Sequence, residues 1–159
     1  MSVGQVKSVL LGIDGLHCSA CSLSAEKLLL QLDFIKEVKM DLNKHVAEVT
    51  FKEGAGIDFA AMAAKVVDAG FSVRSLFVVY NFTNVSVADH FCFDALTMTF
   101  SFIGIKSSKV LNGPELIHLV GKDFMPGGEY KKWKLLETNS CHSVYPIDAG
   151  AKKVYQVTL

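Results

Sequence analysis

Two cysteines stand at the boundary between a strand-like and a helix-like segment, and this placement constrains the chain more than any other feature. Cys18 and Cys21 follow the apolar, β-rich run Val6–Ile13 and precede the helical pattern Leu23–Leu32. Cysteines three residues apart at a helix start share one face. Free backbone N–H groups and the helix dipole lower thiol pKa there. With no carboxylate nearby, two thiolates suit soft ions such as Cu(I).

The first half of the chain predicts two strand–helix units in the order βαββαβ. After the first strand and helix, alternation and turn residues predict two further strands, a helix ended by a glycine, and a fourth strand that runs on through Tyr80. These are Ile35–Leu42, Val46–Phe51, Asp58–Ala69 and a strand starting at Phe71. This order is the ferredoxin-like arrangement. We also expect His45, in the turn between the middle strands, to be a surface residue at the end opposite the cysteines.

Residues 6–76 resemble a heavy-metal-associated domain, the module of copper chaperones and of the N-terminal arms of metal-exporting P-type ATPases. The resemblance rests on the run Gly15-Leu16-His17-Cys18-Ser19-Ala20-Cys21 and on Val67-Asp68-Ala69-Gly70-Phe71. It implies that Cys18 and Cys21 are the metal ligands and that Phe71 shields them. Leu16 takes the place of the family's common Met, and His17 is an accessory candidate, either a third ligand or a solvent-facing side chain.

The chain divides into two predicted parts, residues 5–80 and residues 81–159. The second part predicts a small mainly-β domain, either a compact barrel or a sheet packed on the first domain, so the fold class is α+β. Its strand-like stretches are separated by turn residues, including Asn112-Gly113-Pro114, and no long helical pattern competes with them. The stretches are Phe91–Ile105, Glu115–Val120, Tyr130–Glu137 and Lys153–Leu159.

A second group of sulfur and imidazole side chains lies in this part: His90, Cys92, Cys141 and His142. His90 and Cys92 are predicted to share a strand face, and if folding brings them to Cys141 and His142, the four side chains are candidates for a Cys₂His₂-like metal site. A Cys92–Cys141 disulfide and two unconnected cysteines are the alternatives. A disulfide would favour an oxidising compartment.

These residues predict a soft-metal binding and transfer protein. Cu(I) is the expected ion, with Zn(II), Cd(II) or Hg(II) as alternatives, and the expected partner is a metal-transporting or metal-accepting protein. The alternatives are a thiol–disulfide oxidoreductase that uses the same cysteines and a metal-sensing accessory subunit. Two chains could share one ion and form a metal-bridged dimer.

Other functions find little support in the composition. Sixteen basic and sixteen acidic residues give no net charge, which argues against a nucleic-acid partner. No apolar run is long enough to span a membrane, and no catalytic motif indicates an enzyme. The location stays open: the start as given predicts a cytoplasmic protein, whereas an exported or periplasmic one is expected if residues 1–4 are not native.

Overall fold

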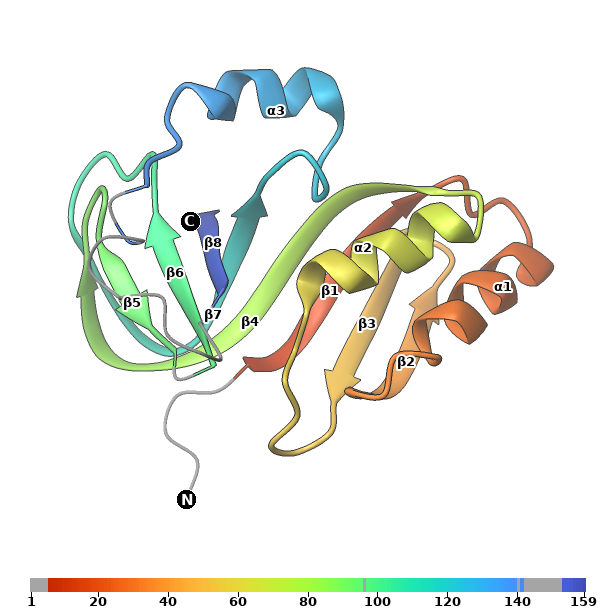
Figure 1. Ribbon diagram of the computed structural model, residues 1–159. Helices are drawn as coiled ribbons and strands as arrows, with labels where there is room; N and C mark the ends of the chain where they lie inside the picture. The colour runs from red at the N-terminus through yellow and green to blue at the C-terminus, as the bar shows by residue number, and fades with distance from the viewer. Residues whose placement is uncertain (1–5, 96, 140, 142–152) are drawn as a thin grey trace.

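A computed structural model of the chain describes residues 6–95, 97–139, 141 and 153–159. Within these residues the strands form one eight-stranded sheet in the order β2-β3-β1-β4-β7-β8-β6-β5, and α1 and α2 lie side by side on it (Figure 1). The elements, in chain order, are β1 (Val6–Asp14), α1 (Ser19–Leu29), β2 (Ile35–Asp41), β3 (Val46–Phe51), α2 (Phe59–Asp68), β4 (Ser72–Val87), β5 (Cys92–Asp94), β6 (Met98–Phe102), β7 (Lys109–Val120), α3 (Gly127–Lys134) and β8 (Lys153–Thr158).

The first half has the predicted βαββαβ order. α1 and α2 pack on the sheet face that carries the buried side chains of Val9, Leu11 and Ile13 of β1. α1 begins at Ser19, earlier than the pattern indicated, because Cys18 already serves as its N-cap. α2 begins after Asp58, whose carboxylate accepts a hydrogen bond from the Ala61 N–H at 3.1 Å. Both helix starts are therefore fixed by their capping side chains.

β4 carries the sheet from the first half into the second and extends to Val87, beyond Tyr80, where the predicted fourth strand ended. Its first part pairs with β1 and its later part with β7, both antiparallel. Val78, Tyr80 and Phe82 along β4 are all buried in one core cluster that contains residues of both halves. β5 to β8 therefore extend the same sheet. The division into residues 5–80 and 81–159 stays a prediction.

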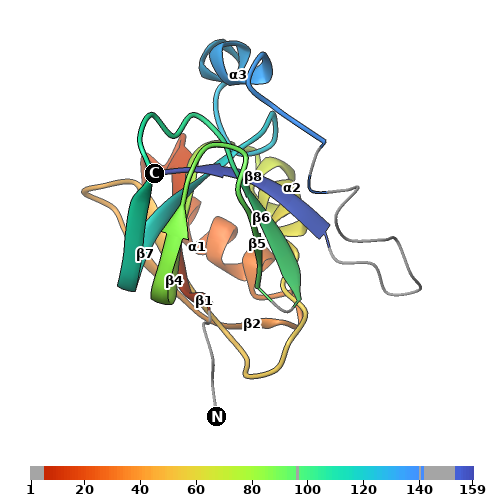
Figure 2. The same cartoon turned by 90° about the vertical axis from the view of Figure 1, so that its left-hand side faces the viewer.

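The second half of the sheet curls so that β8 reaches the start of α2 (Figure 2). The ring of Tyr155 on β8 lies 4.9 Å from that of Phe59, centre to centre, and its hydroxyl accepts a hydrogen bond from the Phe59 N–H at 3.3 Å. The Lys153 ammonium lies 2.6 Å from the Asp58 carboxylate. These contacts join the two halves in addition to β4.

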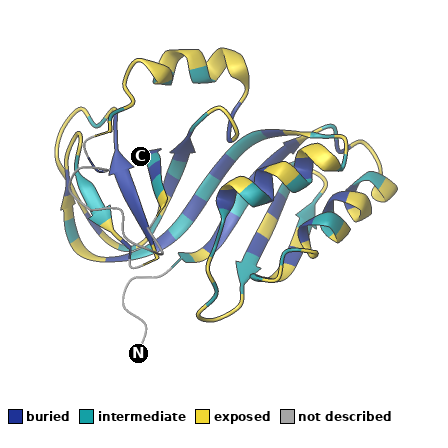
Figure 3. Cartoon of the chain, viewed as in Figure 1, coloured by how far each residue is buried: buried dark blue, intermediate teal, exposed yellow. Residues whose placement is uncertain are grey.

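The predicted strand Tyr130–Glu137 is wrong, because α3 occupies most of this stretch. Tyr130 and Trp133, three residues apart and so on one helix face, pack on Ile103, Val120 and Met125. The rest of α3 is exposed (Figure 3). In so short a segment the polar lysines mask the helical spacing of the two aromatic side chains.

Two further predictions about strands are wrong. The stretch Phe91–Ile105 is not one strand, since β5 and β6 are separate antiparallel neighbours. The predicted turn Asn112-Gly113-Pro114 lies inside β7, opposite a shift in the β4 register between Phe82 and Val85. Gly113 has a positive φ of 80° there. A bulge has the same glycine signature as a turn, which explains the error.

No helix among the described residues is long and apolar enough to cross a membrane.

Candidate metal centre

The cysteine loop, residues 15–21, joins β1 to the first turn of α1, carries Cys18 and Cys21, and packs tightly against Phe71 and the core. Gly15 has a φ of +106°, and a Cβ placed there would lie 2.8 Å from the Phe71 ring. Leu16 is 2% exposed and belongs to the core. Phe71 therefore lies against the cysteine loop, Leu16 ties the loop to the core, and the loop has little room to shift inward.

Cys18 and Cys21 differ in their surroundings. Cys18 is exposed, whereas Cys21 is half-buried against the core, and both are free thiols. The Cys18 Sγ accepts a hydrogen bond from the Cys21 N–H at 3.2 Å. The Cys21 thiol, and then this N–H, hold the pKa of Cys18 below its ordinary value. The helix start thus favours a thiolate on an accessible sulfur.

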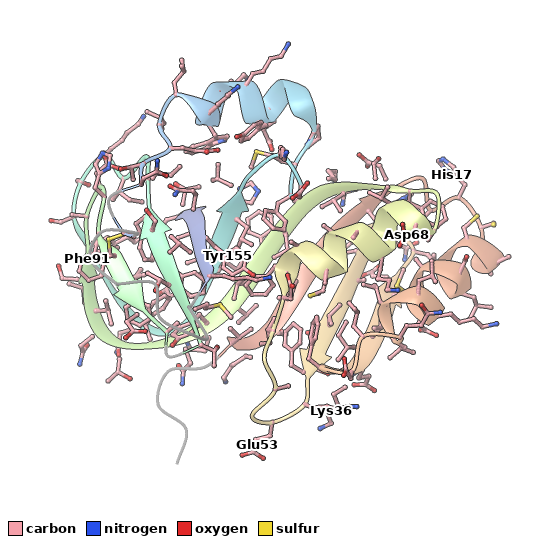
Figure 4. All side chains as sticks on the ribbon, in the orientation of Figure 1. His17, Lys36, Glu53, Asp68, Phe91 and Tyr155 are labelled. Carbon is pink, nitrogen blue, oxygen red and sulfur yellow. A yellow bond between two sulfur atoms is a disulfide. The ribbon has the colours of Figure 1, made fainter. Side chains whose placement is uncertain are left out.

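Two histidines lie beside this loop, one of them unexpectedly. His17 is exposed at the loop, at the end of the molecule away from Tyr155 and Phe91 (Figure 4). The ring of His45 lies 6.5 Å from that of His17, centre to centre. The two rings line one hollow of about 380 Å³ with Leu16, Cys18, Ser19 and Leu42. The prediction that His45 lies opposite the cysteines is therefore wrong.

The topology explains where His45 lies. β3 runs antiparallel to β1, so the start of β3 pairs with the end of β1. The Ile13 N–H donates to the His45 carbonyl at 2.9 Å. The hairpin between β2 and β3 is therefore at the same end of the sheet as the cysteine loop.

Arg74 of β4 holds this hairpin in place, a role that the sequence patterns did not indicate. Its guanidinium donates to the Asp14 carboxylate at 3.1 Å, to the Lys44 carbonyl at 3.1 Å and to the His45 carbonyl at 3.3 Å. It lies over Gly12 of β1, where a Cβ would come within 3.0 Å of it. The available sequence signal for this role was Gly12, because a glycine inside a strand often marks a place where another group approaches closely.

The second group of candidate ligands does not come together as a metal site among the described residues. Cys92 and Cys141 form a disulfide, with Cα atoms 5.6 Å apart, which was one of the alternatives. His90 lies in a turn with a φ of +66°, and its ring nitrogen faces the Asp89 carboxylate at 3.3 Å. His142 lies outside the described residues. Bonded to each other, the two sulfurs are not available as thiolates.

In the part of the chain that the structure describes, no three or more His, Cys, Asp or Glu side chains are close enough together to hold a metal ion as they stand. The donors already placed side by side are thus the Cys18 and Cys21 sulfurs. Two sulfur donors match ions that accept low coordination numbers and thiolate ligands.

Comparison with known proteins agrees with this geometry, since residues 10–72 match the family of heavy-metal-associated domains. This segment is a heavy-metal-associated domain. The match contains both cysteines, both helices and the hairpin with His45. The rest of the chain lies outside it.

Of three known proteins to which this chain is similar, two carry copper in their names. Copper-transporting ATPase 1 of Rhizobium meliloti (strain 1021) is 28% identical over 134 residues, which cover 84% of this chain. The copper binding domain of HMA7, a P-type ATPase, is 25% identical, with a TM-score of 0.39, over 43% of this chain and 90% of that one. The CopZ metallochaperone is 19% identical, with a TM-score of 0.40, over 42% of this chain and 98% of that one.

The match to the Rhizobium ATPase covers most of this chain but only a small part of that protein. The chain spans about 15% of that protein's length, whereas the aligned stretch extends well beyond residue 72 of this chain. Sequence similarity to this relative therefore continues past the heavy-metal-associated domain.

Proposed function

We propose that this chain binds Cu(I) through the thiolates of Cys18 and Cys21 and passes it to a partner by ligand exchange. The observation that carries the proposal is the pair itself: two free thiols, one exposed, at the start of α1, with the Cys18 pKa held low. It lies within a heavy-metal-associated domain. Soft thiolates are the ligands that Cu(I) prefers.

The different exposure of the two sulfurs sets the order in which they release the ion. Cys18 is accessible at the loop surface, while Cys21 is held against the core. An incoming thiolate of the partner bonds to Cu(I) first, giving a three-coordinate intermediate, and Cys18 then leaves. No electron moves in this exchange, and each sulfur remains a thiolate while it holds the ion.

The copper-transporting name of the Rhizobium relative supports a metal-transporting or metal-accepting protein as the partner. In this proposal the chain is a carrier and not an enzyme. A sensing role, in which metal would change how two halves dock, is less well supported, because β4 and a single core cluster join the halves. A thiol–disulfide oxidoreductase remains the second candidate, since a thiol of lowered pKa at a helix start also suits redox chemistry.

Anaerobic titration of the reduced protein with Cu(I), against a competing chelator, tests the proposal. We expect one tight equivalent in the wild type and its loss in Cys18→Ser/Cys21→Ser. Ser24→Ala, on the exposed surface of α1, is the matched control and should bind copper like the wild type. Circular dichroism of each variant checks that the fold is kept.

Binding that survives the double substitution would overturn the proposal. In that case the reduction potential of the Cys18/Cys21 pair becomes the quantity to measure, because the redox candidate requires a reversible disulfide. Gel filtration at each copper ratio also tests the expectation of a metal-bridged dimer. A dimer that appears at half an equivalent of copper would show that two loops share one ion.

A further inference from the structure

α3 is attached to the rest of the molecule by one side only. Tyr130 and Trp133 pack on the small core cluster beneath the helix. The Trp133 ring also lies over Gly104, where a Cβ would come within 2.7 Å of it. The helix stands outside the sheet, at one end of the molecule (Figures 1 and 2). Its opposite side therefore faces away from the protein.

The side of α3 opposite the aromatic pair carries lysines and leucines. At 3.6 residues per turn, Lys131, Lys132 and Leu135 project from this side. The Leu136 N–H donates to the Trp133 carbonyl at 2.8 Å, so the helical path continues and Leu136 extends the same side. Leu135 is 89% exposed and Leu136 is 47% exposed. We call Lys131, Lys132, Leu135 and Leu136 the outer face of α3.

The positive charge at the outer face of α3 is local, because the chain as a whole has no net charge. Lys131, Lys132 and Lys134 are all exposed in the last turn of the helix. Among the described residues, none of these three ammonium groups is part of an ion pair. Glu129 lies in the first turn, and Glu137 faces the Tyr130 hydroxyl on the aromatic side. The lysines therefore stay available to an acidic partner.

Exposed leucines between lysines suit the surface of a bilayer that contains acidic phospholipids. Leucine side chains enter the boundary between head groups and acyl chains, while lysine stems lie along this boundary and their ammonium groups reach the acidic head groups. A stable protein–protein interface buries about 800 Å² on each partner, which is more than two turns of a projecting helix supply. A bilayer surface is soft and accepts such a projection without a matching shape.

We propose that the outer face of α3 docks this chain on an acidic phospholipid bilayer. Leu135 and Leu136 would enter the head-group region, and Lys131 and Lys132 would bind the acidic head groups. The aromatic pair keeps the helix fixed on the protein while its outer face meets the bilayer. This inference goes beyond the proposed copper function and does not rest on it, because the outer face of α3 contains neither cysteine of the metal loop.

Energy transfer from tryptophan to a dansyl-labelled lipid tests the docking, because Trp133 is the one tryptophan of the chain and lies on α3 itself. The vesicles contain phosphatidylcholine alone or a mixture with phosphatidylglycerol. Each lysine near an acidic bilayer strengthens binding about fivefold, so the neutral vesicles should bind at least about tenfold more weakly. Added salt should also weaken binding to the acidic vesicles, because it screens the lysines.

Two variants of the outer face of α3 separate the charge from the apolar contact. Lys131→Gln/Lys132→Gln should weaken binding to acidic vesicles by at least about tenfold. Leu135→Ser/Leu136→Ser should weaken it by a similar factor, because both leucines lose their contact with the bilayer. All four side chains are exposed, so the melting temperature of each variant should stay close to that of the wild type.

Matched variants on the other half of the molecule are the controls. Lys36→Gln/Lys39→Gln removes the same charge from exposed positions of β2. Leu23→Ser/Leu30→Ser removes two leucines of α1 that are 52% and 45% exposed. Both should bind acidic vesicles like the wild type, because neither touches the outer face of α3.

Three results would overturn the proposal. These are equal energy transfer with neutral and acidic vesicles, an outer-face variant that binds like the wild type, and no transfer to acidic vesicles at low salt. The last result is the one expected if an acidic protein, and not a bilayer, covers this face. Cu(I) titration of the same variants should match the wild type, so the copper function and the membrane docking can each fail without the other.

Discussion

Replacing Tyr155 by Phe tests whether β8 supports the helix that packs behind the metal loop. Tyr155 is 7% exposed, and its hydroxyl accepts a hydrogen bond from the N–H of Phe59, the first residue of α2. That N–H has no acceptor within its own helix. Phe keeps the ring against Phe59 but leaves this buried donor without its partner. An unpaired buried donor costs about 1–2 kcal/mol, which lowers the melting temperature by roughly 2–8 °C.

The same hydroxyl makes stability depend on pH at the alkaline end. Burial raises the pKa of Tyr155 from 10 to about 12, and burial raises that of Tyr80 to about 12 as well. Above pH 10 the unfolded chain loses these protons while the folded chain keeps them, so stability falls until about pH 12. Each tyrosine contributes at most about 1.4 kcal/mol per pH unit. Tyr155→Phe should therefore remove about half of this slope.

Urea denaturation at pH 7 and at several values between pH 10 and 12 measures both effects. Tyr130→Phe, which removes a hydroxyl near the surface of α3, is the control at pH 7 and should change the midpoint little. An unchanged midpoint for Tyr155→Phe at pH 7 would refute a stabilising role for the hydrogen bond between the Phe59 N–H and the Tyr155 hydroxyl. An unchanged alkaline slope would show that Tyr155 ionises equally in the folded and unfolded chains.

Three further perturbations address the disulfide, the loop and the hairpin. Removing the disulfide with Cys92→Ser/Cys141→Ser should destabilise the fold by up to about 4 kcal/mol, because the bond joins residues 49 positions apart in the sequence. Four reactive thiols instead of two in the native, unreduced wild type would contradict the bond. Gly15→Ala meets the Phe71 ring at 2.8 Å with a φ of +106° and should cost about 1–3 kcal/mol, so an unchanged melting temperature would refute the tight packing of the loop. Arg74→Met removes a guanidinium whose side chain is 37% exposed and should cost about 1 kcal/mol; a loss that does not shrink in high salt would argue against its ion pair with Asp14.

The first half could be predicted because its local signals agree with one another. Alternation marks β2 and β3, Asp58 and Gly70 mark the ends of α2, and the cysteine loop stands where β1 gives way to α1. The second half is stabilised by contacts between distant residues. The bulge opposite Gly113 and the bond between Cys92 and Cys141 depend on which strands become neighbours, and no short stretch of sequence encodes that.

The position of His45 is a different case, because the predicted order of strands and helices already implied it and the prediction missed it. Once the order βαββαβ is accepted, β3 must start beside the end of β1, so the hairpin and the cysteine loop share one end of the sheet. What the order could not show is that Arg74 anchors the hairpin. The contact between the His17 and His45 rings also depends on packing alone.

The placement of the second half limits how it can act on the metal loop. Its strands extend the sheet from the far side of β4, and His17 lies at the opposite end of the molecule from Phe91 (Figure 4). A partner can therefore approach Cys18 without meeting β5 or β6. The second half reaches the metal-binding half through β4 and through the contacts of β8 with α2. Its effect on the metal site would pass through the stability of the shared core, which the Tyr155 substitution measures directly.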